Sequence, residues 1–267
     1  CFSADPDSVG TLDRYLRPFY ESDINNGVIT REEAKEYLQE LFLMLQAATN
    51  VDSRNFTRGA ESHFCIGGYL PDGNDGFDDL SKLILESLME IGLNGFVVKN
   101  YEELQLLSDF AKQSNKTINI IADHNLYTYN DYAKREFDKY GILRDTIPLE
   151  LNKKEILNRD NTRSEMIIYG YYPLMTTAGC VHKNTDKCDK ISQITYLKDR
   201  YKTYFPVKNN CNECYNVIYN SVPVVMFKEQ EELKKHGVCH FRLSFTIETK
   251  EETNAVLDLF EGKGTEI

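Results

Sequence analysis

The clearest indication of the fold class is the stretch Ile118-Asn119-Ile120-Ile121-Ala122-Asp123. It is a short apolar run that ends in a polar residue, a pattern that predicts a buried strand. From residue 92 onward, similar runs alternate with amphipathic stretches, and this alternation predicts a parallel α/β architecture. The predicted strands are 95–98, 118–122, 145–149, 166–170, 217–219 and 241–245, and the predicted helices are 101–113, 129–140, 228–236 and 250–260. Five or six strands are too few to close an eight-stranded barrel. We therefore expect a partial (β/α) barrel-like domain.

The first ninety residues have a different, helical pattern. Thr30-Arg31-Glu32-Glu33 is a capping box sequence that predicts the start of a long helix, and a second helix is expected over 78–89. Charge changes at the same place, since residues 1–92 hold 17 acidic and 7 basic side chains, whereas the remaining residues hold 25 and 24. This change predicts two domains of different origin, 1–91 and 92–267, joined near residues 88–93.

Composition also indicates the cellular compartment of the protein and excludes some classes of partner. No stretch has the length and apolarity of a membrane span, and the first residues lack the basic head and apolar run of a signal peptide. Seven cysteines without such a signal favour a reducing compartment. We expect a cytoplasmic protein with no membrane partner. The net charge of −11 argues against non-specific nucleic-acid binding.

Four cysteines have the spacing of metal ligands. Cys180 and Cys188 are followed by Cys211-x2-Cys214, and a Cys-x2-Cys turn can hold one metal with two thiolates. Two such pairs suit either a [4Fe–4S] cluster or zinc. A cysteine-rich metal loop is therefore expected in the second domain, the alternative being four reduced cysteines in a packed loop.

Four polar residues next to predicted strands are candidates for catalysis. Asp123 and His124 end one strand, and Glu150 and Glu165 lie beside two others. The carboxyl ends of parallel strands are where active-site residues gather, and a carboxylate there can act as a general base. The alternatives are a loop histidine bonded to backbone for His124, a structural acceptor for Glu150, and a helix cap or a partner of Arg163 for Glu165.

Several phrases of the first domain resemble an internal part of the pyruvate formate-lyase-like glycyl radical enzymes. These are residues 11–18 (Thr-Leu-Asp-Arg-Tyr-Leu-Arg-Pro), 29–34 (Ile-Thr-Arg-Glu-Glu-Ala), 62–69 (Ser-His-Phe-Cys-Ile-Gly-Gly-Tyr) and 75–77 (Asp-Gly-Phe). The resemblance covers roughly residues 5–90 and implies an anaerobic source. Neither the catalytic cysteine loop nor the Arg-Val-x-Gly radical motif of that family is found, which implies ancestry without activity for this segment.

Residues of the second domain resemble peptidase family U32, the collagenase-like peptidases. The phrases are 95–100, 122–127, 149–152 and 165–175, the last running toward Cys180; Tyr169 stands where the family commonly has histidine. The resemblance covers about residues 93–260. It implies a hydrolase (protease) that acts on protein or peptide, and the cluster-bearing relatives favour [4Fe–4S] over zinc at the four cysteines.

Three functions remain open at this point. The first is a U32-type peptidase with a cysteine-bound cluster. The second is an RNA-modifying iron–sulfur protein, because residues 150–215 hold 11 basic against 8 acidic residues together with tyrosines whose rings can stack on bases. The third is a non-functional fragment of a glycyl radical enzyme fused to a truncated barrel.

Overall fold

The computed structural model describes residues 8–50, 63–67, 70, 74, 76–114, 117–185, 188, 191–211 and 214–263. Parts of the resembling phrases, namely residues 62, 68, 69 and 75, lie outside this set. The chain divides into two compact units, Cys1–Asn94 and Gly95–Ile267, here called unit 1 and unit 2. None of the helices in the described residues is both long and apolar enough to cross a bilayer.

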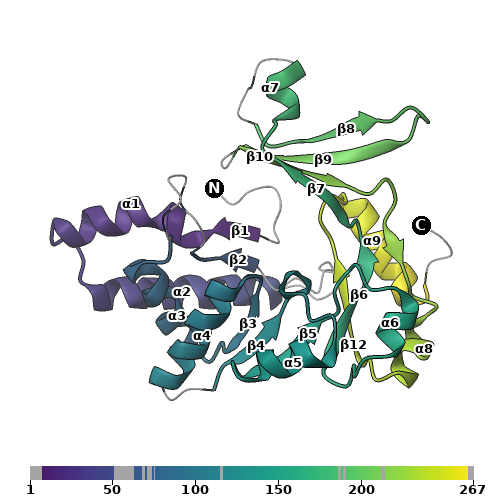
Figure 1. Ribbon diagram of the computed structural model, residues 1–267. Helices are drawn as coiled ribbons and strands as arrows, with labels where there is room; N and C mark the ends of the chain where they lie inside the picture. Colours follow the sequence, from purple (N-terminus) through teal and green to yellow (C-terminus); the bar gives the residue numbers. More distant parts are fainter. Residues whose placement is uncertain are drawn as a thin grey trace. The chain divides into compact units, whose positions relative to one another are not determined.

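Unit 1 is mainly helical, as its sequence pattern predicts (Figure 1). Its elements in chain order are β1 (Ser8–Thr11), α1 (Leu12–Asn25), α2 (Arg31–Asn50), β2 (His63–Cys65) and α3 (Asp79–Glu90). The two short strands pair in parallel. The predicted capping box is confirmed: the Thr30 hydroxyl accepts from the amide of Glu33 at 3.2 Å, and the Glu33 carboxylate accepts from the amide of Thr30 at 2.8 Å.

Asp13 joins three separate segments of unit 1. Its side chain, which is fully buried, accepts hydrogen bonds from the amide of Gly67 at 2.6 Å, the hydroxyl of Ser81 at 2.5 Å and the amide of Arg14 at 2.9 Å. These four residues are called the Asp13 network. Nearby, Arg17 donates to the carbonyl of Gly76 at 2.6 Å. The network therefore ties the start of α1 to the segment after β2 and to α3.

In its described residues, unit 2 contains a six-stranded, mostly parallel sheet with helices between its strands. Five of its strands are parallel to their neighbours, in the order β3-β4-β5-β6-β12. The short β11 is antiparallel to β6. These strands are β3 (Gly95–Val98), β4 (Asn119–Ala122), β5 (Ile142–Thr146), β6 (Ser164–Gly170), β11 (Val224–Val225) and β12 (His240–Ser244). The predicted mixed α/β class with a parallel sheet is confirmed.

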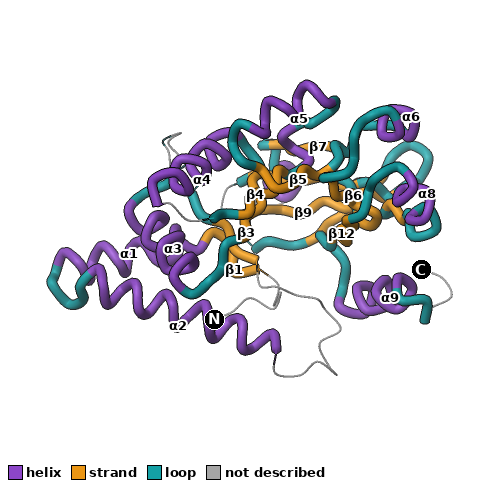
Figure 2. The backbone as a smooth tube through the Cα atoms, turned by 90° about the horizontal axis from the view of Figure 1, so that it is seen from below, coloured by secondary structure: helices purple, strands orange, loops and turns teal. Residues whose placement is uncertain are grey.

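Helices connect these strands along the chain and lie outside the sheet (Figure 2). Helix α4 packs on β3 and β4, and α5 packs on β5. A core cluster that includes Ile147, Ile156, Met166 and Leu233 joins the sheet to α6 and α8. The helices are α4 (Tyr101–Ser114), the 3-10 turn η1 (His124–Leu126), α5 (Asp131–Asp138), α6 (Lys153–Leu157), α8 (Gln230–Lys235) and α9 (Lys250–Phe260).

A second, antiparallel sheet was not expected from the sequence. Its strand order is β7-β10-β9-β8, and the helix α7 (Val181–Thr185) follows β7 in the chain. The strands are β7 (Pro173–Thr177), β8 (Ile194–Lys198), β9 (Tyr204–Asn210) and β10 (Tyr215–Tyr219). The predicted strand 217–219 belongs to this sheet and not to the parallel one.

Strand β5 also differs from its predicted range. The sequence predicts a strand over 145–149, but β5 spans Ile142–Thr146. Pro148 has no amide hydrogen to donate, so the strand ends before it. Arg144 and Asp145 weaken the strand signal in the sequence, because charged residues are rare inside sheets. In the structure, Asp145 has two buried cationic partners, Lys134 and Arg159.

Candidate functional site

Residues from four neighbouring strands meet where β4 and β5 end. The register pairs Ala122 of β4 with Asp145 of β5, and Thr146 of β5 with Glu165 of β6. Glu165 also pairs with His240 of β12. Because the strands are staggered in this way, the last residues of β4 and β5 lie close to the first residues of β6 and to β12.

Arg242 on β12 is the centre of this meeting point. Its guanidinium donates to Asp123 Oδ1 at 2.8 Å, to Thr146 Oγ1 at 3.0 Å and to Glu165 Oε1. Thr146 Oγ1 donates in turn to Glu165 Oε1 at 2.9 Å. These four residues are called the Arg242 cluster. Two carboxylates share one guanidinium, so the cluster carries a formal charge of −1.

The two carboxylates are nearly buried, while Arg242 remains in contact with solvent. The side chains of Asp123, Glu165 and Arg242 are 5%, 10% and 26% exposed. Each carboxylate uses one oxygen toward Arg242. The described residues make no hydrogen bond to the other oxygen of either group, so each can accept one from a ligand.

His124 lies beside the Arg242 cluster, and its side chain is uncharged at neutral pH. It is the first residue of η1, directly after Asp123, and it is partly buried. Burial lowers the pKa of its imidazole below 6.5, and Arg242 and Lys99 lower it further, although Asp123 and Glu150 act in the opposite direction. The imidazole is therefore uncharged at neutral pH and can accept a proton.

Glu150 lies in the loop after β5, and its side chain is exposed. It acts on two neighbours, raising the pKa of His124 and, together with burial of the phenol, the pKa of Tyr129. Of the four predicted candidates, Asp123 and Glu165 are thus joined through Arg242, while His124 and Glu150 interact electrostatically. Thr146 and Arg242 were missed. The available signal for Arg242 was a charge inside the apolar run 241–245.

A second charged group lies next to the Arg242 cluster and is structural in character. Asp145 is buried and accepts from Thr128 at 2.6 Å and Ser164 at 2.7 Å, and it forms ion pairs with Arg159 at 2.5 Å and Lys134 at 3.4 Å. Burial alone would raise the pKa of Asp145, but the two cations lower it below its usual range. Full burial leaves this carboxylate no route to a substrate.

The predicted cofactor at the four cysteines, a [4Fe–4S] cluster or zinc, is wrong. In the described residues, which include all four cysteines, no group of three or more His, Cys, Asp or Glu side chains could hold a metal. The Cys211-x2-Cys214 segment connects β9 to β10, and there Cys211 Sγ donates to the carbonyl of Ile191 at 3.3 Å. Spacing indicates that two thiols can share a metal, but it does not bring two separate pairs together. This corrects both the [4Fe–4S] and the zinc assignments.

The tyrosines that suggested RNA binding lie mostly on the antiparallel sheet. Tyr196, Tyr204 and Tyr215 are exposed residues of β8, β9 and β10. Lys198 lies over the ring of Tyr204 at 4.9 Å from its centroid. The ammonium of Lys198 therefore already has an aromatic partner. RNA binding stays a prediction.

Comparison with known proteins places unit 1 beside one enzyme family. Residues 5–95 match the family model described as pyruvate formate lyase-like. The chain is 35% identical over 92 residues to trans-4-hydroxy-L-proline dehydratase of Clostridioides difficile, covering 32% of this chain and 11% of that protein. It is 33% identical over 94 residues to isethionate sulfite-lyase of Bilophila wadsworthia, covering 33% and 11%.

A third relative is the 4-hydroxyphenylacetate decarboxylase glycyl radical subunit of Clostridioides difficile, 32% identical over 87 residues, with 31% of this chain and 10% of that protein covered. The chain thus spans about a tenth of the length of these curated relatives. No solved structure matches. The resemblance of the first domain to pyruvate formate-lyase-like enzymes is confirmed by these matches.

The same matches correct the predicted function. The relatives are a dehydratase, a lyase and a decarboxylase subunit, and the matching family model is pyruvate formate lyase-like. The prediction of a U32 collagenase-like peptidase, with hydrolase or protease activity, is therefore wrong. The phrases that resemble U32 are short runs at or near the strands of a parallel sheet, and a shared fold class does not establish a shared function.

Proposed function

We propose that residues 5–95 form a scaffold segment of a glycyl radical enzyme of the pyruvate formate lyase-like class. Such enzymes include the dehydratase, lyase and decarboxylase subunit that match this chain. The segment positions other parts of such an enzyme and does not itself hold the radical, since the sequence contains no Arg-Val-x-Gly motif.

The observation that carries this proposal is the Asp13 network. Asp13 belongs to the phrase 11–18, and Gly67 belongs to the phrase 62–69, both within the matched range. The carboxylate of Asp13 accepts from the amide of Gly67 at 2.6 Å, so two phrases that are 54 residues apart are in direct contact. Ser81 extends the same network to α3 at 2.5 Å. The described residues of the matched segment therefore share a buried polar centre that joins α1 to α3.

A segment exchange tests this proposal. Residues 5–95 replace the matching segment of trans-4-hydroxy-L-proline dehydratase, and turnover of that enzyme's substrate is measured after anaerobic activation. We expect a soluble chimera with activity within about tenfold of the parent, because a scaffold segment makes no contact that forms only in the transition state. A tenfold loss of activity corresponds to about 1.4 kcal/mol of transition-state stabilisation. The same chimera with Asp13→Ala serves as the control and is expected to lose folded yield. A chimera that folds but has no turnover contradicts the scaffold role.

We also propose that unit 2 has a proton-transfer site for a small polar molecule at the Arg242 cluster. The order β3-β4-β5-β6 with a helix after each of the first three strands supports a barrel-like sheet, whose carboxyl ends usually hold the active site. His124 would accept the proton, while Asp123 and Glu165 would accept hydrogen bonds from the ligand. The lowered pKa of His124 favours this role because its base form is the main form at neutral pH.

The pKa of His124 tests this second proposal by NMR titration of the imidazole. We expect a value below 6.5, an increase in Lys99→Gln because that cation lowers the pKa, and a decrease in Asp123→Asn because that carboxylate raises it. His124→Gln assigns the resonance among the five histidines. Lys99 is exposed, so its variant keeps the fold. A pKa above about 7 in the unmodified protein would leave most of the His124 imidazole charged at neutral pH and would rule it out as the base.

A further inference from the structure

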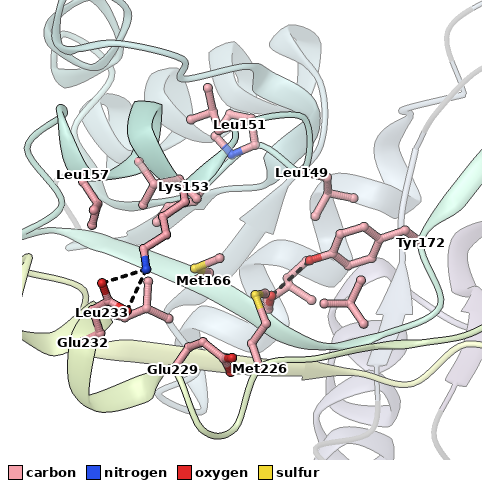
Figure 3. A pocket seen from close by; sticks show the side chains of 15 residues that line it. Leu149, Leu151, Lys153, Leu157, Met166, Tyr172, Met226, Glu229, Glu232 and Leu233 are labelled. Carbon is pink, nitrogen blue, oxygen red and sulfur yellow. Dashed lines mark hydrogen bonds and ion pairs between the residues drawn. The ribbon is translucent and has the colours of Figure 1, made fainter.

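A pocket of about 230 Å³ lies in unit 2 between the end of β5, the strand β6 and the helices α6 and α8. Figure 3 shows Met166 and Met226 at its centre, Leu157 and Lys153 on one side and Tyr172 on the other. Most of its lining is apolar. The pocket is independent of unit 1 and of the proposed scaffold role.

One wall of the pocket is rigid and the other is adaptable. Ile147, Ile156 and Met166 are buried members of the core cluster. Leu151 and Met226 are partly buried side chains that pack against that cluster. Methionine fills irregular spaces and changes shape easily. Lining atoms that face the empty pocket lack van der Waals neighbours on that side. An apolar ligand in the pocket would supply these dispersion contacts.

The volume limits the size of the ligand. A dry cavity of ~150 Å³ in another protein holds one benzene molecule. The present volume of about 230 Å³ is larger by roughly half. The pocket therefore fits roughly eight to ten carbon atoms, as in a linear octyl chain or two fused aromatic rings.

The charges around the pocket limit the head group of the ligand. Lys153 Nζ forms an ion pair with Glu232 at 2.8 Å, and this pair, marked in Figure 3, is neutral as a whole. Glu229 also lines the pocket, and the structure gives its carboxylate no ion pair within the described residues. The formal charge of the three residues is −1, which favours a cationic head over an anionic one.

The pocket and the Arg242 cluster lie on opposite faces of the same strands. Ile147 and Met166 line the pocket, and the residues before them, Thr146 and Glu165, belong to the Arg242 cluster. Successive side chains of a strand point to opposite faces of the sheet. A ligand in the pocket would therefore touch the backbone of the candidate site without entering it.

We propose that this pocket binds a small amphiphile with an apolar body of about eight to ten carbons and a single cationic group, such as an alkyl or aryl ammonium ion. The apolar body fills the space beside Met166 and Met226, and the cation lies next to Glu229. The side chain of Glu229 is at the protein surface, so the head group keeps part of its water.

Binding of octylammonium, 1-octanol and octanoate to the full chain tests the proposal, measured by calorimetry and by NMR shifts of residues 147–157. Octylammonium is expected to bind about tenfold more tightly than octanoate, with octanol between them, because one partly screened charge contributes about 0.7 kcal/mol in each direction. Glu229→Gln should remove the preference between the two ions and leave octanol unchanged. Glu251→Gln, an exposed change on α9, is the matched control and should change nothing.

Two further variants fill the pocket. Met226→Trp and Leu157→Trp should each weaken all three probes at least tenfold, and Leu157 lies on the partly exposed side of α6, so its variant keeps the fold. Three results would overturn the proposal: no saturable binding up to about 1 mM, equal binding in both tryptophan variants, or octanoate binding more tightly than octylammonium.

Discussion

Asp13→Ala is expected to lower the free energy of unfolding of unit 1 by about 4 kcal/mol, a large share of the stability of a domain of this size. The carboxylate of Asp13 is fully buried and accepts from Gly67, Ser81 and Arg14. Removing it leaves the amide of Gly67 buried without its acceptor, and it leaves the hydroxyl of Ser81 only Asp78 Oδ1, at 3.1 Å, as an acceptor. An unpaired buried donor costs about 1–3 kcal/mol, and the cavity left by the carboxylate adds to this cost.

Hydrogen–deuterium exchange of the full chain measures this loss within unit 1. The amides of α1 and α3 should exchange roughly a hundredfold or more faster in Asp13→Ala, since every 1.4 kcal/mol corresponds to a factor of ten in the opening equilibrium. Glu21→Ala changes an exposed acid on the same helix and is the control. Equal protection in the two variants would show that the Asp13 network does not hold unit 1 together.

Arg159→Met should destabilise unit 2 by about 3–5 kcal/mol. The side chains of Arg159 and Asp145 are 2% and 0% exposed and pair at 2.5 Å. Removing Arg159 leaves the buried carboxylate of Asp145 with Lys134, at 3.4 Å, as its remaining cation. Such incomplete compensation of a buried charge is far more costly than losing a surface pair. Arg163→Met is the matched control, because Arg163 and Asp138 form an ion pair at 2.7 Å with 53% and 39% of their side chains exposed. The control should cost less than about 1 kcal/mol.

Acid unfolding gives the second measurement on the same pair. The pKa of Asp145 lies below its ordinary value of 3.8, so its contribution to stability is fully present above that pH and is lost as the pH falls through the lower folded value. Arg159→Met removes the strongest cause of this lowering. We expect the acid transition of unit 2 to move to higher pH in Arg159→Met and to stay in place in Arg163→Met. An unchanged transition in Arg159→Met would contradict the assigned role of the pair.

Local signals in the sequence predicted the helices well. The capping box at Thr30 opens α2, and the expected helix 250–260 matches α9 because Thr249 caps it with a hydrogen bond from the amide of Glu252 at 3.2 Å. These features depend only on residues within four positions of one another. The strands β3 and β6 were found for a similar reason, since each is a short apolar run.

Contacts between distant residues could not be predicted from one sequence. Arg242 meets Asp123 across 119 positions, and this contact depends on β12 pairing with β6 next to β5. The antiparallel sheet was missed because its strands carry exposed tyrosines and the segments between them carry the cysteines. That composition was interpreted as a metal module. Asp123 and Glu165 were found because strand ends are visible in the sequence, but the side chain that joins them was not.

The most direct measurement of the central claim is the glycyl radical content of the segment-exchange dehydratase, by electron paramagnetic resonance after anaerobic activation. A scaffold segment equivalent to that of the relatives should give a radical signal close to that of the parent enzyme. The Asp13→Ala chimera should give a weaker signal because its segment is less stable. A soluble, folded chimera without any glycyl radical would contradict the account, since residues 5–95 would then not replace the segment they match.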